Sequence, residues 1–309
     1  MRLALRWACM LCIAVGAACT AENSVATPVV SPAPSAAATA TPQTQPLVFS
    51  GTRAYDSVVR QVALGPRITG TRPNRVLGDR ILNELAANGW VTQTQTFTYM
   101  NTPIRNLVGI KGDGRNIVII GAHYDTRRRA DQDKQHPDQP VPGADDGASG
   151  VAVLLELSRV LNASRTGKQV WLVFFDAEDN GDLDGWSWLV GSRYFAGKLT
   201  VKPSAVVVVD MVGDAQQDIY LERSSNQALA GRIWDVADRL GYGGQFIRKL
   251  KWDMVDDHTP FLGRGLPAVD LIDFDYPYWH TTQDTPDKIS ADSLQRVGRT
   301  LQVWLESKP

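Results

Sequence analysis

The chain has 309 residues, of which 43% are hydrophobic and 21% are charged, and its formal net charge is -1. This length allows one sizeable hydrophobic core, and the balanced charge argues against a nucleic-acid partner. All three cysteines, Cys9, Cys12 and Cys19, lie at the N-terminus, so the rest of the chain cannot use a disulfide, a cysteine nucleophile or cysteine-ligated zinc.

Residues 1–19 predict a secretory signal peptide, because Arg2 and Arg6 precede an apolar run that ends in small residues. The small residues before Cys19 resemble a bacterial lipoprotein cleavage box, although Gly16 stands where leucine is usual. Simple secretion and lipidation of Cys19 both stay open. Either outcome places the protein outside the cytoplasm, with a lipid anchor at Cys19 as its only expected membrane contact.

Residues 20–46 are rich in Pro, Ala, Thr and Ser and contain almost no charge, which predicts a disordered linker. Residues 47–309 are then expected to form one catalytic domain. Helical spacing first appears over residues 54–64 and 74–88, with Gly89 as a stop signal.

Apolar runs alternate with helical patterns along the rest of the domain. The predicted strands are residues 91–100, 105–112, 116–125, 169–176, 205–213 and 266–274, and the predicted helices after them are 147–161, 227–241 and 290–307. This alternation predicts an α/β fold, a three-layer α/β/α sandwich with a mixed, mostly parallel central sheet. The first two strands are expected to pair antiparallel at one edge.

The strand over residues 170–175 is apolar without alternation, which is typical of a strand covered on both faces. Three acids follow it directly: Asp176, Glu178 and Asp179. The carboxyl ends of strands in an open α/β sheet face the crevice where ligands bind. Since Glu178 and Asp179 are adjacent, they must point in different directions, so one could hold a cation while the other moves protons.

Other acids and histidines also fall at predicted strand ends or helix starts: His123, Asp146, Asp210 and His280. A single aspartate at such a position is usually a turn former or a helix cap. Several together indicate a shared site, because the ends of neighbouring parallel strands meet. Imidazole and carboxylate ligands suit zinc.

Five segments, in order, carry a family resemblance: HYD at 123–125, GADDGASG at 143–150, FFDAED at 174–179, VVDMVGD at 208–214 and DYPYWHT at 275–281. They resemble the zinc aminopeptidase superfamily, which contains two-metal aminopeptidases and single-zinc glutaminyl-peptide cyclotransferases. The resemblance covers about Tyr55 to Leu305 and implies the same fold and a zinc cofactor.

The resemblance implies three ligands for the zinc common to both branches: Asp146, Asp179 and His280. His123 and Asp210 would hold a second metal in an aminopeptidase, with Asp125 at that metal or behind its ligands. Many such aminopeptidases carry two glutamates at the centre of the site. Here the ligand position holds Asp179, whose side chain is shorter, and this difference favours one metal ion over two. A cis peptide bond between Asp146 and Gly147 is also expected.

Two features resemble the cyclotransferase branch. Trp279 and Trp186 match tryptophans of an aromatic substrate pocket, although simple packing is the alternative for Trp186 and for Trp188. The segment DDHTPFLGRG at 256–265 matches one that supplies an aspartate to a buried acid network, here Asp256. Asp270, expected beside the substrate, stands where animal cyclotransferases have histidine, and His258 is expected to cap or pack against the following helix.

Catalysis is expected to depend on three acids: Glu178, Asp210 and Asp256. The first hypothesis is a glutaminyl-peptide cyclotransferase, in which Glu178 carries a proton from the α-amine to departing ammonia. In a zinc aminopeptidase, the alternative, Glu178 takes a proton from metal-bound water. The third hypothesis is an inactive peptide-binding surface lipoprotein. The presence of Glu178 argues against it, because a binding site has no use for a base next to a metal ligand. The expected substrate is a peptide with a free N-terminus, the expected cofactor is one zinc ion, or two in an aminopeptidase, and the expected state is a monomer.

Overall fold

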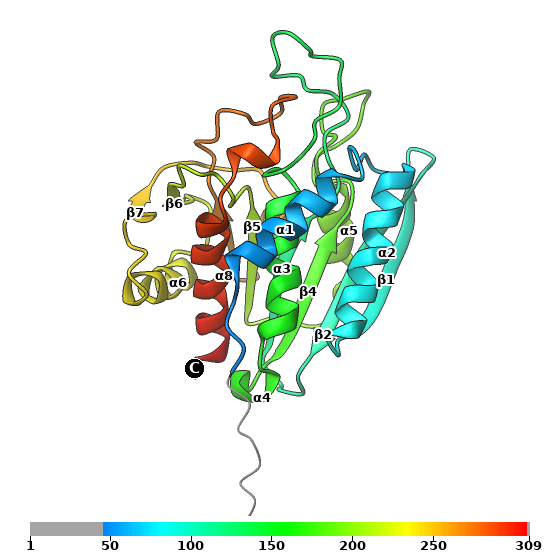
Figure 1. The fold of residues 1–309 in the computed structure, drawn as a ribbon. Helices are drawn as coiled ribbons and strands as arrows, with labels where there is room; N and C mark the ends of the chain where they lie inside the picture. The colour runs from blue at the N-terminus through cyan, green and yellow to red at the C-terminus, as the bar shows by residue number, and fades with distance from the viewer. Residues whose placement is uncertain (1–45, 308–309) are drawn as a thin grey trace, which may run out of the picture. The chain divides into compact units, whose positions relative to one another are not determined.

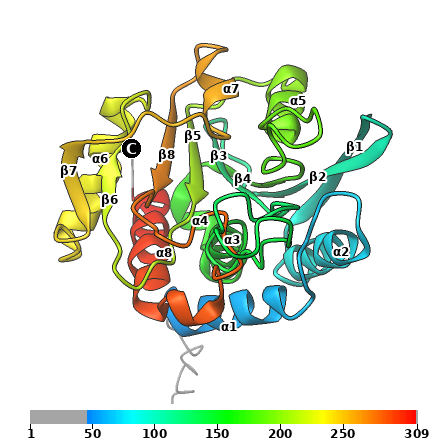
Figure 2. The same ribbon diagram turned by 90° about the horizontal axis from the view of Figure 1, so that it is seen from above.

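The computed structural model describes residues 46–307. The predicted signal peptide, Cys19 and nearly all of the predicted linker lie outside this range. The described residues form a sheet with helices on both faces, which confirms the predicted three-layer α/β/α sandwich (Figures 1 and 2). Between residues 46 and 307, no helix is both long and apolar enough to cross a membrane.

The main sheet of the described chain has six strands in the order β1-β2-β4-β3-β5-β8. Their bounds are β1 Val91–Tyr99, β2 Thr102–Lys111, β3 Ile117–His123, β4 Gln169–Phe175, β5 Ala205–Asp210 and β8 Ala268–Ile272. The predicted antiparallel pair, β1 and β2, forms one edge, and β2 is also antiparallel to β4. The strands β4, β3, β5 and β8 pair in parallel, so their carboxyl ends meet on one side.

Four helices cover one face of the sheet: α1 Gly51–Val62, α2 Arg72–Ala87, α3 Ala148–Val160 and α8 Ala291–Glu306 (Figure 2). The other face carries α5 Val190–Lys198 and the short α7 Thr259–Leu262. Two single turns are α4 Ala163–Thr166 and the 3-10 helix η1 Pro286–Lys288.

Beyond β8 lie α6 Gln227–Arg239 and a small parallel sheet, made of β6 Ile219–Leu221 and β7 Phe246–Leu250. The sequence pattern predicted α6 but neither α5 nor this small sheet. β6 is three residues long, which is too short to show a period, and α5 is amphipathic only weakly.

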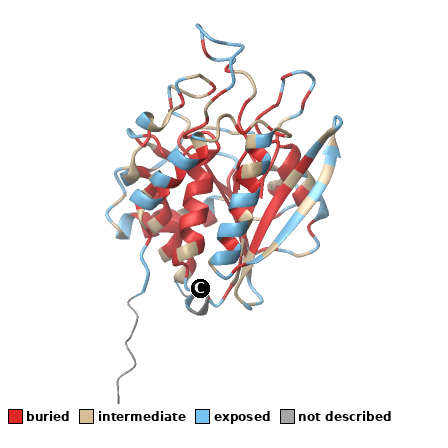
Figure 3. Cartoon of the chain, turned by 45° about the vertical axis from the view of Figure 1, so that its right-hand side comes forward, coloured by how far each residue is buried: buried red, intermediate tan, exposed pale blue. Residues whose placement is uncertain are grey.

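The core occupies both faces of β4, which explains why this strand shows no alternation. Phe174 packs in the cluster under α1, α2, α3 and α8, whereas Phe175 packs against Phe195 of α5 and Phe261 of α7. Figure 3 shows that buried residues fill the middle of the sheet and the inward faces of the helices, whereas the edge strand β1 has no buried residue. Burying an unpaired charge in such a layer has a high free-energy cost, so the acids appear only where β4 ends.

Candidate metal centre

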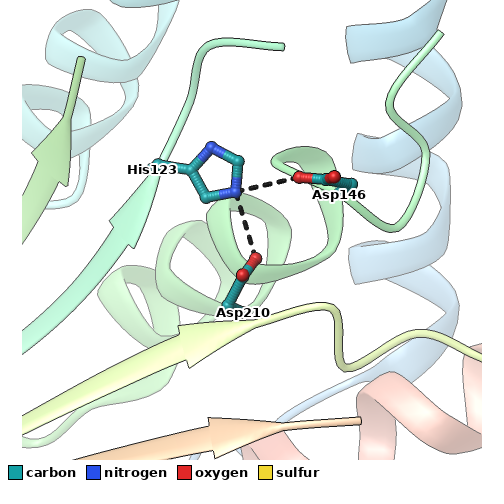
Figure 4. Close-up of side chains that lie close together, drawn as sticks. All are labelled: His123, Asp146 and Asp210. Atoms are coloured by element: carbon teal, nitrogen blue, oxygen red, sulfur yellow. Dashed lines mark hydrogen bonds and ion pairs between the residues drawn. The ribbon is translucent and has the colours of Figure 1, made fainter. Parts of the chain in front are cut away.

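Three buried side chains meet above the carboxyl ends of β3 and β5. His123 is the last residue of β3, Asp210 is the last residue of β5, and Asp146 lies just before α3. Nε2 of His123 is 3.2 Å from Oδ1 of Asp146 and 3.1 Å from Oδ1 of Asp210 (Figure 4). These spacings suit three ligands of one ion, since ligands about 2 Å from a metal lie roughly 3 to 4 Å apart.

A second group shares Asp146 with the first. Nε2 of His280 is 3.0 Å from Oδ1 of Asp179 and 3.5 Å from Oδ2 of Asp146. Neither carboxylate oxygen of Asp179 has a hydrogen-bond partner among the described residues, although the side chain is buried. Two carboxylates and one imidazole, with unpartnered oxygens, fit a zinc ion.

Asp146 is therefore placed between the two groups, with Oδ1 toward His123 and Oδ2 toward His280. The predicted ligands Asp146, Asp179 and His280 come together as one group, and His123 and Asp210 come together beside them. This geometry can accept one metal ion or two with a bridging carboxylate.

The electrostatics of the two groups favour a cation. Burial, together with the charge of Asp146, raises the pKa of Asp179 to about 6. Burial also raises the pKa of Asp210 to about 7, although His123 opposes the shift. Burial alone would lower the pKa of His280, but the nearby acids, Asp179 first, raise it to about 9. A bound divalent ion would compensate this concentration of buried carboxylates.

Glu178 is buried next to Asp179 but belongs to neither group. Burial is the main cause that raises the pKa of Glu178 well above its usual range. Asp125 holds the backbone here, since its carboxylate accepts from the N–H of Glu178 at 3.0 Å and of Asp179 at 3.3 Å. Asp125 also lies 3.6 Å from Nδ1 of His123, so the structure places it behind the ligands.

A cavity of about 50 Å³ opens beside the ligands. Its polar lining is Asp146, Glu178, Asp179, Asp210, Asp256 and His280, and its apolar lining is Trp188, Met211, Met254, Val255, Ile272, Phe274 and Trp279. The ring of Trp279 stacks on His280 with 3.7 Å between centroids, and the ring of Trp188 is nearly parallel to His280 at 6.0 Å. The ligand histidine is thus part of an aromatic wall.

Trp186 does not line this cavity, contrary to its predicted place beside the substrate. It packs in a separate cluster with Ile104, Ala177 and Val190, and its ring meets the edge of Tyr99 at 5.3 Å. Trp188 occupies the predicted position instead. Because both tryptophans lie in one irregular loop, no periodicity in the sequence distinguishes which of them faces the cavity.

Asp256 lines the cavity, whereas Asp270 is fully buried in β8, outside the cavity lining. A direct contact of Asp270 with substrate is therefore not supported by its position. His258 occupies the N-cap position of α7 without a side-chain capping bond. Its Nε2 instead lies 2.8 Å from Oγ of Ser224.

The expected cis peptide bond between Asp146 and Gly147 is absent, since every peptide bond between residues 46 and 307 is trans. Gly147 makes the turn into α3 with a φ of 96°, a conformation that glycine adopts readily because it has no Cβ. The turn thus needs no cis bond to place Asp146 at the site.

Two residues that the sequence pattern did not single out support the ligands. Asp131 lies 3.5 Å from Nδ1 of His280 and accepts two hydrogen bonds from Arg127, at 2.7 and 2.8 Å. Arg127 also donates to the backbone oxygen of Asp179 at 3.0 Å and lies over the ring of Trp188. Both residues come from a charged loop whose composition is typical of a solvated surface.

Comparison with known families and structures gives consistent matches. The model of "Peptidase family M28" matches residues 106–305. Porphyromonas gingivalis glutaminyl cyclase is 34% identical with a TM-score of 0.77, over 84% of this chain and 98% of that one. A leucine aminopeptidase precursor from Bacteroides thetaiotaomicron is 28% identical with a TM-score of 0.80, over 86% and 99%.

Curated relatives fall in the same two classes. Glutaminyl-peptide cyclotransferase of Bos taurus is 25% identical over 70% of each chain. Aminopeptidase YwaD of Bacillus subtilis (strain 168) is 28% identical over 65% of this chain, which spans 44% of the length of YwaD. The family match covers well over half of the chain and includes both groups of candidate ligands. The chain therefore belongs to peptidase family M28.

Proposed function

We propose that the protein is a zinc-dependent glutaminyl-peptide cyclotransferase, which converts the N-terminal glutamine of a peptide to pyroglutamate and releases ammonia. The observation that carries the proposal is the aromatic wall at the ligand His280, formed by Trp279 and Trp188. Aromatic faces suit a flat, uncharged amide. The lining of this small cavity contains no lysine or arginine among the described residues, so it offers no countercharge to an acidic side chain.

Asp146, Asp179 and His280 would hold the zinc ion. When bound there, zinc would polarise the γ-carbonyl of the glutamine side chain as a Lewis acid. Trp188, Trp279 and Phe274 would hold the side-chain amide and limit the access of water.

Glu178 would move the proton. The α-amine nitrogen forms a bond to the side-chain carbonyl carbon, Cδ, and the bond from that carbon to the amide nitrogen breaks. The carboxylate of Glu178 takes one proton from the amine and gives it to the leaving nitrogen, which departs as ammonia, so Glu178 ends in its starting state and no water is consumed. Burial raises the pKa of this carboxyl, which makes its carboxylate a stronger proton acceptor.

A zinc aminopeptidase is the second candidate, because His123, Asp146 and Asp210 have the spacing of a second metal site. In that reaction Glu178 would take a proton from water instead, and the first peptide bond would be cut. Both aminopeptidases and glutaminyl cyclases occur among the similar proteins, so the reaction must be decided by its products.

The proposal is tested by incubating the zinc-loaded protein with a peptide that begins with glutamine and identifying the product by mass spectrometry. We expect a product that keeps all its residues and has lost one ammonia, and no such product from the Asp179→Ala variant. A product shortened by its N-terminal residue would show an aminopeptidase.

A further inference from the structure

A third group of metal-ligand types lies next to the catalytic cavity, outside both groups described above. Its members are Asp256, His258 and Asp270, all buried, and one ligand atom from each lies within 4.8 Å of the others. Asp270 interrupts the apolar strand β8, where every neighbouring residue of the strand is hydrophobic. Both oxygens of Asp270, Oδ2 of Asp256 and Nδ1 of His258 have no hydrogen-bond partner among the described residues.

The hydrogen bonds of His258 show which ring nitrogen is a donor. Oγ of Ser224 lies 2.8 Å from Nε2 of His258 and donates its single proton to Oε2 of Glu222 at 3.1 Å. Ser224 must therefore accept the proton of Nε2–H, so Nδ1 is the ring nitrogen that is turned toward Asp270.

Nδ1 of His258 faces a carboxylate. Nδ1 of His258 is 3.7 Å from Oδ2 of Asp270, and this is the one ion pair that Asp270 or Asp256 forms between residues 46 and 307. Two buried carboxylates that accept no hydrogen bond at these oxygens repel one another, so a cation or additional protons must lie among them.

The surroundings of His258 match those of the two candidate ligand histidines, His123 and His280. In each, one ring nitrogen faces the candidate ligand carboxylates and the other faces a supporting carboxylate, which is Asp125 for His123 and Asp131 for His280. For His258, Glu222 is the supporting carboxylate, 3.4 Å from Nε2. Such a partner behind the ring is the usual companion of a metal-ligating histidine.

We propose that Asp256, His258 and Asp270 form an additional metal site that takes a divalent cation of the zinc class. The donor set is two carboxylates and a neutral imidazole, which zinc accepts. The ion would connect β8 to the segment before α7 and would hold Asp256 at the wall of the catalytic cavity. This site does not depend on which reaction the catalytic centre performs.

The first test is a count of bound metal. The protein is stripped with a chelator, dialysed to equilibrium against zinc, and its zinc content is measured by inductively coupled plasma mass spectrometry. We expect His258→Gln and Asp270→Asn each to bind one zinc ion fewer per chain than the wild type. His136→Gln, which changes an exposed histidine in a surface loop, is the matched control and should bind as much as the wild type.

Wild-type zinc content in both variants, with circular dichroism showing that they are folded, would overturn the proposal and assign extra protons to the group. Should the variants fail to fold, crystals of the wild type grown with zinc decide the question. An anomalous difference peak between His258 and Asp270 supports the site, whereas a peak at His280 without one at His258 overturns it. Neither result depends on turnover, so a failure of the proposed cyclotransferase activity is distinguished from a failure of this site.

Discussion

The carboxylate of Asp131 lies 3.5 Å from Nδ1 of His280, while Nε2 of the same ring faces Asp179 and Asp146. Arg127 fixes Asp131 with two hydrogen bonds and also donates to the backbone of Asp179. One loop thus supports two of the three candidate zinc ligands. A carboxylate behind a ligand histidine orients its ring and raises its basicity.

Asp131→Asn should therefore weaken zinc binding by about 10- to 100-fold, because an amide holds the imidazole less strongly than a carboxylate does. The measurement is competition for zinc with a chromogenic chelator. Asp138→Asn, an exposed position in the same loop, is the control and should leave the affinity unchanged. Equal affinities in the two variants would show that Asp131 has no role at the metal.

Glu178→Gln should lower turnover by about 10²- to 10⁴-fold, the usual contribution of a positioned proton carrier. Zinc content and melting temperature should change little, because Glu178 belongs to neither ligand group. Asp179→Ala should instead lose the zinc. Turnover close to that of the wild type in Glu178→Gln, or loss of its metal, would assign the proton transfer to another residue.

The two neighbouring tryptophans should respond differently to truncation. Trp186→Ala removes a buried side chain from an apolar cluster and should lower the free energy of unfolding by about 3 to 5 kcal/mol. Trp188→Ala, at the cavity, should mainly raise the KM for a glutaminyl peptide. Denaturant unfolding and steady-state kinetics on both variants check this, and a larger KM effect in Trp186→Ala would reverse the assignment.

Glu222 should make the free energy of unfolding depend on pH in the acidic range. Burial alone would raise its pKa, but the nearby ring of His258 and the hydrogen bond from the backbone of Ser224, among others, lower it to about 2 from an ordinary 4.5. A carboxyl whose pKa is depressed in the folded state contributes stability above the unfolded value, and that contribution is lost as the pH falls toward the folded value.

Glu222→Gln should therefore lower the free energy of unfolding at pH 7 by about 1 to 3 kcal/mol, since several buried donors lose a charged acceptor. The difference from the wild type should shrink as the pH is lowered from about 5 toward 3. Urea unfolding at several pH values measures it. A difference that stays constant over this range would contradict the assignment of an ionised Glu222.

The position of the ligands could be predicted from the sequence because it follows from topology. His123 and Asp210 end neighbouring parallel strands, and such ends must meet. Asp179 lies in the short segment that follows β4, at the same edge of the sheet. The family resemblance then distinguished ligands from ordinary turn formers.

The supporting residues could not be predicted in the same way. Asp131 and Trp188 lie in irregular loops, where no period relates sequence position to direction, so Trp186 was as good a candidate as Trp188. His258 and Asp270 are close only because α7 and β8 pack together. The local sequence around either residue does not indicate its contact with the other. The one indication in the sequence was that Asp270 is a single acid within the apolar strand AVDLI.

Cyclisation of glutamine at a zinc site in an aromatic cavity is the reaction that we propose. It is tested most directly by giving the zinc-loaded protein Gln-β-naphthylamide and Leu-p-nitroanilide and measuring ammonia and free arylamine separately. We expect ammonia from the glutaminyl substrate and little arylamine from the leucyl one, because the attacking amine is already part of the substrate and needs only orientation. Rapid release of arylamine from the leucyl substrate, without ammonia from the glutaminyl one, would contradict the claim and indicate an aminopeptidase.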